Sequence, residues 1–284
     1  HKNSSLATLD SWKSLSVVFD AALVDAAKTA INGINTTDWT TFAAIDAELK
    51  KVTDAVATKL FTFQCTDVSD AKRVNVYVAA NASTGRAVGA DNQDYNAIWT
   101  LQYAGGTSFY LYNELNKVYL GAPVDNQTAV ALTETPVAAY SFEWIEDNVV
   151  EMKCNGGTLH ASNHDDDKLI SYDGDQAASR WNVATIDISG DIQAILDDLT
   201  SEDYAEIPAL GQYPTSAYNA LYEAKNTAKT VAEVNAAIDA FKKAKNLPVF
   251  TIDGAGTEYA KGKSILVVDD NIINLRVADG ILSS

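Results

Sequence analysis

Acidic, amide and aromatic side chains gather in two short stretches of the chain. The richer stretch supplies Asn163, His164, Asp165, Asp166, Tyr172 and Asp173, and the other supplies Asp125 and Asn126. Carboxylates and amides form paired hydrogen bonds, and a tyrosine ring offers a flat apolar face, so such a set suits a ligand rich in hydroxyl groups. Because Asn and Asp also tolerate left-handed backbone conformations, ordinary turns are the alternative interpretation.

Calcium is a second chemistry that these residues could serve. The run "NHDDDK" (163–168) and the nearby "DGD" (173–175) carry many carboxylate oxygens, and calcium takes about six to eight oxygen ligands. Their spacing does not match an EF-hand loop, so we interpret them as solvated acidic turns. The three histidines, at positions 1, 160 and 164, do not form a cluster in sequence. We interpret His160 as a packed, hydrogen-bonded side chain, and we predict no metal and no cofactor.

The sequence favours a protein that is not an enzyme. It contains no G-x-S-x-G elbow, P-loop or dinucleotide fingerprint. Glu143, Glu146, Asp147 and Glu151 lie close together, but strand alternation sends them to both faces of a sheet, whereas a glycosidase needs two acids across one cleft. Hydrolysis that depends on Asp165 or Glu146 is the alternative.

Charge and hydropathy exclude two classes of partner. The formal net charge is −17, and a chain this acidic repels nucleic acid, whose affinity for proteins depends largely on basic contacts to phosphate. No apolar run approaches the roughly 20 residues of a membrane helix. An Asn- and Thr-rich composition with one methionine is typical of exported bacterial surface proteins. We therefore expect a secreted or cell-surface protein whose signal peptide or lipid anchor is removed or lies outside this sequence.

Hydrophobic periodicity divides the chain into four segments. Apolar residues keep to helical steps from Leu9 to Ile31 and from Trp39 to Leu60, which predicts an N-terminal helical hairpin over 1–60. A helical segment and a second hairpin follow over 188–247, with a capping box at 230–233, and we expect the two hairpins to form one bundle. The last segment, 248–284, is predicted to be β, and its stretch 265–282 is similar to the opening of response-regulator receiver domains.

The middle segment, 61–187, alternates with period two and contains an internal repeat. Short strands group into three units of about forty residues, with Cys65, Asn113 and Cys154 at matching positions. Each unit ends in an aromatic strand, in which we align Trp99, Trp144 and Trp181. One unit cannot bury its apolar face alone, so we predict that the units close on one another with the three tryptophans in a shared core. The fold class is then α+β multidomain, a β-trefoil flanked by helical hairpins.

This three-unit pattern resembles ricin-type β-trefoil domains, which carry a Q-x-W signature near the end of each unit. The tryptophans are present, but Ala97, Phe142 and Ser179 stand where the glutamines are expected. The resemblance covers about 125 residues. The order of segments, with a helical hairpin after the trefoil, looks like that of large secreted or surface proteins of gut Bacteroidetes, in which such pieces flank glycan-degrading enzymes.

The resemblance implies a non-catalytic accessory module that binds an oligo- or polysaccharide in shallow pockets, one in each unit. The third unit would use the residues around Asn163 and Tyr172, the second Asp125 and Asn126, and the first Asn81, Asp91 and Tyr95. The alternative is a structural spacer or interaction region of a larger glycoside hydrolase or adhesin. Pockets without an exposed aromatic ring would favour this alternative. The chain could equally be part of a longer protein.

The two cysteines occupy equivalent positions in units one and three. A disulfide between Cys65 and Cys154 would tie these units together. Symmetry-related positions need not lie within the roughly 7 Å that a disulfide requires, so we favour two buried free thiols packed as small apolar groups.

Overall fold

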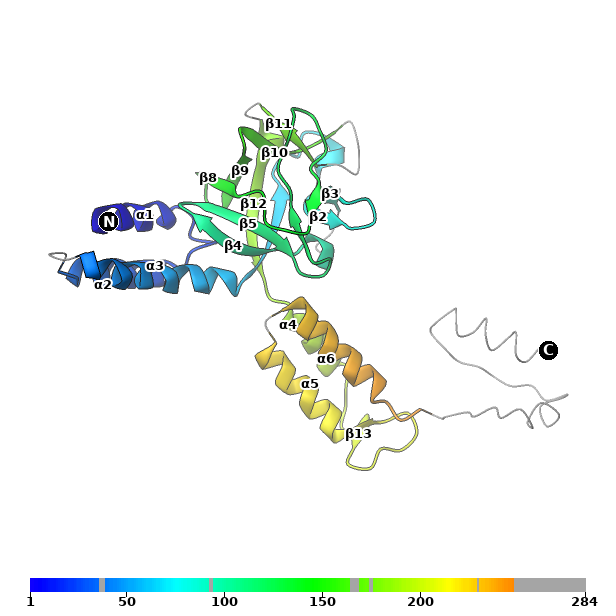
Figure 1. Ribbon diagram of the computed structural model, residues 1–284. Coiled ribbons are helices and arrows are strands. Elements are labelled where there is room, and N and C mark those ends of the chain that lie inside the picture. The colour runs from blue at the N-terminus through cyan, green and yellow to red at the C-terminus, as the bar shows by residue number, and fades with distance from the viewer. Residues whose placement is uncertain (36–38, 92–93, 164–168, 174–175, 229, 248–284) are drawn as a thin grey trace.

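The protein consists of a closed β-barrel with helices on two sides (Figure 1). The computed structural model describes residues 1–35, 39–91, 94–163, 169–173, 176–228 and 230–247. The C-terminal β segment predicted for 248–284, and with it the receiver-like stretch, lies outside the described residues. No helix in the described part combines the length and apolar character that crossing a bilayer requires.

Six strands form the barrel, two from each repeat unit. They are β1 (Leu60–Cys65), β4 (Thr100–Gly105), β5 (Ser108–Asn113), β8 (Tyr140–Glu146), β9 (Val149–Cys154) and β12 (Arg180–Ile186). Antiparallel pairing runs from β4 through β5, β8, β9 and β12 to β1. The ring closes where Phe61 and Trp99 exchange two backbone hydrogen bonds of 2.9 Å. Closure leaves no free sheet edge within the barrel.

Three short hairpins cover one end of the barrel. The hairpins are β2 (Tyr77–Asn81) with β3 (Arg86–Ala90), β6 (Val118–Leu120) with β7 (Leu132–Thr133), and β10 (Gly157–Ala161) with β11 (Leu169–Tyr172). Backbone bonds link the hairpins to one another, from Ala87 to Val130 at 2.9 Å and from Val130 to Leu169 at 3.0 Å. A six-stranded barrel capped by three joined hairpins is a β-trefoil, and this confirms the predicted fold.

Each barrel strand points two large apolar side chains into a common core. The twelve residues are all at most 2% exposed and come from the three units in matched pairs: Phe61, Phe63, Trp99, Leu101, Phe109, Leu111, Tyr140, Phe142, Val150, Met152, Trp181 and Val183. Burying aromatic side chains of this size supplies much of the hydrophobic free energy of folding.

Trp144 is not part of this core, so the alignment of three tryptophans is wrong for the second unit. Trp144 is 49% exposed, whereas Tyr140 is fully buried and lies midway in the sequence between Trp99 and Trp181. The ring donors confirm the equivalence, because each bonds a carbonyl in, or one residue after, the second strand of its own unit. Trp99 Nε1 donates to Val78 at 2.8 Å, Tyr140 Oη to Gly121 at 2.7 Å, and Trp181 Nε1 to Leu159 at 3.0 Å.

The corrected alignment also moves the predicted position of the missing glutamine in the second unit. The residue two before the ring in the second unit is Ala138, not Phe142, and it is small and buried like Ala97 and Ser179. Strand pairing also aligns Leu159 with Val78, because Tyr77 pairs with Gln64 as Thr158 pairs with Lys153. Trp144 instead falls four residues beyond the ring, where its equivalent Tyr103 is also exposed.

The N-terminal helices close the other end of the barrel. Helices α1 (Lys2–Lys13), α2 (Ala21–Gly33) and α3 (Phe42–Ala57) share one continuous hydrophobic core with the trefoil. Trp12 stacks on Phe19 at 4.3 Å, Phe19 contacts Phe109, and Trp12 Nε1 donates to the Gly106 carbonyl at 2.6 Å. The first predicted helix is split after Lys13, because the Asp20 carboxylate caps a new helix through the amides of Ala22 and Leu23.

The C-terminal helices form a separate cluster. Helices α4 (Ser189–Asp197), α5 (Thr215–Thr227) and α6 (Val231–Lys243) pack together, with a two-residue parallel pair between β13 (Tyr204–Ala205) and β14 (Tyr213–Pro214). The predicted capping box of Thr230 and Glu233 begins α6. The single bundle predicted for both helical groups is wrong, since α4–α6 pack on the trefoil at Leu60 and Ile98, away from α1–α3 (Figure 1).

The corrected repeat makes a direct prediction about stability. Tyr140→Ala removes a buried ring and leaves a cavity, so the free energy of unfolding should fall by about 3–5 kcal/mol. Trp144→Ala, at the exposed position, should cost no more than about 1 kcal/mol. Urea unfolding followed by circular dichroism measures both. Equal losses would contradict the placement of Tyr140 as the third core ring.

Candidate functional site

A pocket of about 400 Å³ opens on the first repeat unit. Its walls come from the β2–β3 hairpin, from the turn at 94–96 that leads to Trp99, and from the turn between β5 and β6. Small apolar side chains form part of its surface, and polar ones surround them: Ala79, Ala80, Val88 and Ala90, then Asn81, Ser83, Asp94, Asn96 and Asn116. We call this the unit-1 pocket.

The hairpin turn fixes the side chain of Asn81. Its Oδ1 accepts hydrogen bonds from the Ser83 hydroxyl at 2.7 Å and from the Thr84 amide at 3.3 Å. Gly85 completes the turn with φ of +65°, a conformation in which glycine carries no steric penalty. Asn81 lines the pocket, and the bonds to its Oδ1 fix the orientation of its side-chain amide.

The turn before Trp99 is organised by Asp94 and by a buried asparagine. Asp94 Oδ1 accepts from the Asn96 amide at 2.8 Å and caps a short 3₁₀ turn, Tyr95–Ala97. The Asn113 side chain is fully buried, and its Nδ2 donates to the carbonyls of Tyr95, Asn96 and Ile98 at 3.2, 2.9 and 2.9 Å. A single amide thus satisfies a turn that would otherwise bury three carbonyl groups near one another.

Asn116 joins the two turns across the pocket. Its Nδ2 lies 2.9 Å from both Asn96 Oδ1 and Asn113 Oδ1, and its backbone amide donates to Asn113 Oδ1 at 3.0 Å. Within the described residues, Asp94 Oδ2 and the amide nitrogens of Asn81 and Asn96 have no protein partner. The pocket therefore presents one ionised acceptor and two amide donors over a small apolar surface, a set that can bind neighbouring hydroxyl groups.

Of the predicted third-unit residues, Asn163 contacts the first unit and Tyr172 packs within its own unit. Asn163 donates to Asp70 Oδ2 at 2.9 Å, and the Tyr172 ring stacks on His160 at 4.5 Å. Asp173 is exposed. His164, Asp165 and Asp166 lie outside the described residues, so their part in this region stays a prediction.

His160 stands at the centre of a buried network between these two units. Its Nδ1 lies 2.9 Å from Ser179 Oγ, and its Nε2 lies 3.4 Å from the guanidinium of Arg73. Arg73 also donates to Asp67 at 2.7 Å and to the Ala161 carbonyl at 2.9 Å. Burial, with Arg73 nearby, lowers the pKa of His160 to about 4. The imidazole is therefore neutral near pH 7, and the network ties the β1–β2 loop to β10.

Asp125 and Asn126 lie in an exposed turn beside β11. The Asp125 carbonyl accepts from the Thr128 hydroxyl at 2.6 Å, and Ser171 pairs with this turn through the Gln127 and Thr128 backbones. The fold therefore brings the second-unit turn next to the strand that carries Tyr172. Neither Asp125 nor Asn126 lines either of the two hollows that the described residues form around the trefoil.

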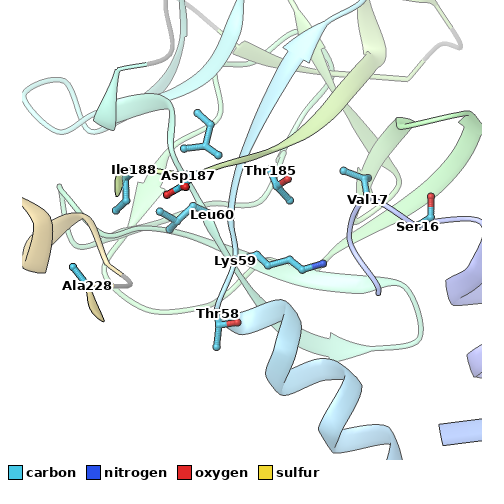
Figure 2. Close-up of a pocket in the computed structure, with 10 residues that line it drawn as sticks. Ser16, Val17, Thr58, Lys59, Leu60, Thr185, Asp187, Ile188 and Ala228 are labelled. Atoms are coloured by element: carbon cyan, nitrogen blue, oxygen red, sulfur yellow. The ribbon is translucent and has the colours of Figure 1, made fainter. Parts of the chain in front are cut away.

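A second hollow, of about 510 Å³, lies where the trefoil meets both helical groups (Figure 2). Lys59 extends along it toward Ser16 and Val17 and donates to the Val18 carbonyl at 3.2 Å. Asp187 accepts from the Ser189 amide at 2.9 Å, and these Ser189 bonds hold its pKa below the usual value. Both charged groups therefore already bind the protein. Among the described residues, no group of three or more His, Cys, Asp or Glu side chains is placed to hold a metal.

Cys65 and Cys154 are both buried and unpaired, which confirms the free-thiol interpretation. Cys65 Sγ lies 3.9 Å from the Ala178 carbonyl, in the turn before Trp181. Asn113 holds the same place relative to the turn before Trp99. Burial raises the pKa of both thiols, which makes them poor nucleophiles.

Comparison with solved structures finds other trefoils. The designed threefold-symmetric protein ThreeFoil matches with a TM-score of 0.39 and 12% identity, over 45% of this chain and 99% of ThreeFoil. A ricin B-like lectin of Macrolepiota procera, solved with lactose, matches with a TM-score of 0.36 and 15% identity, over 43% of this chain and 94% of the lectin. SeviL, solved with the asialo-GM1 saccharide, matches with a TM-score of 0.33 and 10% identity, over 44% and 94%.

Each of these similarities covers less than half of this chain. No family model matches the sequence, and no curated protein matches it. The trefoil assignment rests on the strand pairing and on the three ring-to-carbonyl bonds.

Sequence reasoning named Asn81 for the first unit but missed Asp94, Asn96 and Asn116. The signal was present, because "DYNAIW" (94–99) places an Asp and an Asn just before the core ring. Asp91 is exposed, and Tyr95 turns away from the pocket toward α4. Asn116 belongs to the next unit and reaches the pocket only through folding, so no pattern within one unit could reveal it.

The buried His160 predicts a specific loss of stability in acid. Its pKa is lower in the folded chain, about 4, than its ordinary value of 6.5, so the unfolded chain binds the proton more readily. Stability is full above pH 6.5 and falls as the pH drops toward 4, by about 3 kcal/mol from this residue. Urea unfolding at pH 7, 5.5 and 4 measures the fall. His160→Gln should flatten it, and an unchanged slope in that variant would contradict the assignment.

Proposed function

We propose that this protein is a non-catalytic carbohydrate-binding module of an exported surface protein, and that the unit-1 pocket holds its ligand. The observation that supports the proposal is the convergence of the Asp94 carboxylate with the amides of Asn81 and Asn96. A carboxylate accepts from two adjacent hydroxyls while amide nitrogens donate to hydroxyl oxygens, which is the pattern that a sugar ring presents.

The shape of the pocket fits a terminal or exposed sugar unit. It is open and about 400 Å³ in volume, near the lower end of the range for small-molecule sites. The alanine side chains leave room for a ring to approach the backbone. Among the described residues that line it, Asp94 is the only carboxylate, whereas glycoside hydrolysis by paired carboxylates uses two acids.

A structural spacer is the alternative that one observation favours. No aromatic ring lines the unit-1 pocket, whereas stacking on a ring strengthens many sugar sites. The helices at both ends also pack firmly on the trefoil. A spacer would hold its neighbours apart without binding any glycan.

Glycan binding separates the two functions. The purified chain is applied to a glycan array that includes lactose and the asialo-GM1 saccharide, and the strongest ligand is then measured by calorimetry. We expect binding in the micromolar to millimolar range, and Asp94→Asn should weaken it about ten-fold, because a hydrogen bond to a charged group is lost. Asparagine can still cap the 3₁₀ turn.

Asp125→Asn is the matched control, because it makes the same change in an exposed turn outside the pocket. Its affinity should equal that of the unaltered chain. If Asp125→Asn abolishes binding and Asp94→Asn does not, the ligand lies on the edge between the second and third units. Absence of binding by a folded chain supports the spacer.

A further inference from the structure

The two turns that form the unit-1 pocket are also the turns on which the C-terminal helices dock. In the first turn, Asp94 and Asn96 line the pocket. The residues between and after them, Tyr95 and Ile98, pack in the hydrophobic cluster of α4–α6. One short segment thus has a ligand-facing side and a helix-facing side.

Tyr95 fixes the first turn to α4. Its hydroxyl donates to the carboxylate of Asp191, in the first turn of that helix. The Tyr95 ring is half-buried, and burial together with Asp191 raises its pKa well above the usual value. The phenol therefore keeps its proton near neutral pH and can donate to Asp191.

Glu114 lies beside the N-terminus of α6. Burial raises the pKa of its carboxyl, and the Val231 amide and the Thr230 hydroxyl at the start of that helix offset this only in part. Within the described residues its Oε2 is buried without a hydrogen-bond partner. A carboxylate is favoured there because the helix dipole is positive at its N-terminus. Two residues later, Asn116 reaches back to Asn96 in the pocket.

Asn113 connects the two turns under the pocket. Its amide holds three carbonyls of the first turn, and its Oδ1 holds Asn116 of the second. A shift of either turn must therefore break bonds to the other. The pocket therefore has a hydrogen-bonded support on α4, at Tyr95, and a contact with the start of α6, at Glu114, and Asn113 joins the two turns.

We propose that the α4–α6 module sets the conformation of the unit-1 pocket, with Tyr95 and Glu114 as positioning residues that do not line it. Ligand binding and docking of the module are then coupled, and linkage makes the coupling reciprocal. Only the nature of the ligand, a carbohydrate, rests on the function proposed above. That the α4–α6 module holds the two pocket turns is a claim about the folded chain alone, with or without a ligand.

Hydrogen exchange of the full chain without ligand tests the support. Tyr95→Phe removes one hydroxyl and keeps the ring. Amides in 95–98 and 113–117 should then exchange about ten-fold faster, since a hydrogen bond to a carboxylate is lost. Tyr204→Phe is the matched control, because it removes a hydroxyl at the far end of the module, where Tyr204 stacks on Tyr218.

Two outcomes of this measurement would overturn the proposal. The first is that amide exchange in both pocket turns, 95–98 and 113–117, stays unchanged in the Tyr95→Phe variant and also in the Glu114→Gln variant. The other is faster exchange throughout the barrel, including β9 and β12, which would mean a general loss of stability. Because no ligand is present, these outcomes do not depend on whether the chain binds glycans.

Calorimetry with the ligand from the array tests the coupling. Tyr95→Phe and Asp191→Ala should each weaken binding about five-fold, and the double variant should be no weaker than either single one, since both remove the same bond. Additive losses, or unchanged affinity alongside faster exchange, would refute coupling. If the unaltered chain binds no glycan, the proposed function fails. The hydrogen-exchange result alone then tests whether the α4–α6 module holds the pocket turns in place.

Discussion

The trefoil depends on three buried rings, each of which must find a partner for its polar atom. Trp99, Tyr140 and Trp181 lie in the barrel core, where an unsatisfied N–H or O–H costs about 1–3 kcal/mol. Each satisfies it with a carbonyl of a cap strand. The same side chains therefore fill the barrel and join it to the cap hairpins. A tyrosine serves as well as a tryptophan because its hydroxyl reaches a carbonyl one residue further along.

Threefold repetition of the core leaves the turns free to differ. The end of the first barrel strand carries Cys65, Asn113 or Cys154, and all three are buried. A thiol packs against its neighbouring turn as a small apolar group, whereas the Asn113 amide bonds three carbonyls at once. One polar substitution at an equivalent position thus organises the turn that carries Asp94 and Asn96. The pocket belongs to one unit for this reason, while the barrel belongs to all three.

Local patterns predicted the elements well and their long-range partners poorly. Period-two strands, the forty-residue repeat and the capping box of Thr230 and Glu233 all depend on near neighbours in sequence, and the structure contains them. The alignment of Trp144 with Trp99 and Trp181 is wrong because it matches residue type. The spacing between the units favours Tyr140, which lies midway between the two tryptophans. Asp94 and Asn96 look like ordinary turn residues, and Asp94 does cap a turn. Their second role depends on Asn116, from another unit, which sequence within one unit cannot show.

The helices at the two ends of the trefoil differ in what they contact, and so in what they do for it. Helices α1–α3 share the barrel core, with Trp12 and Phe19 stacked at its open end. Without them, apolar rings such as Phe109 would meet water, so this group acts on stability. Helices α4–α6 bury few barrel residues. Instead, α4 holds the turn at Tyr95 by the hydrogen bond from Tyr95 to Asp191, and α6 begins beside Glu114. A hydrogen bond of this kind adds little to the free energy of folding, but it fixes the orientation of the turn that carries it. A shallow polar pocket depends on the orientation of its polar groups more than on buried apolar area.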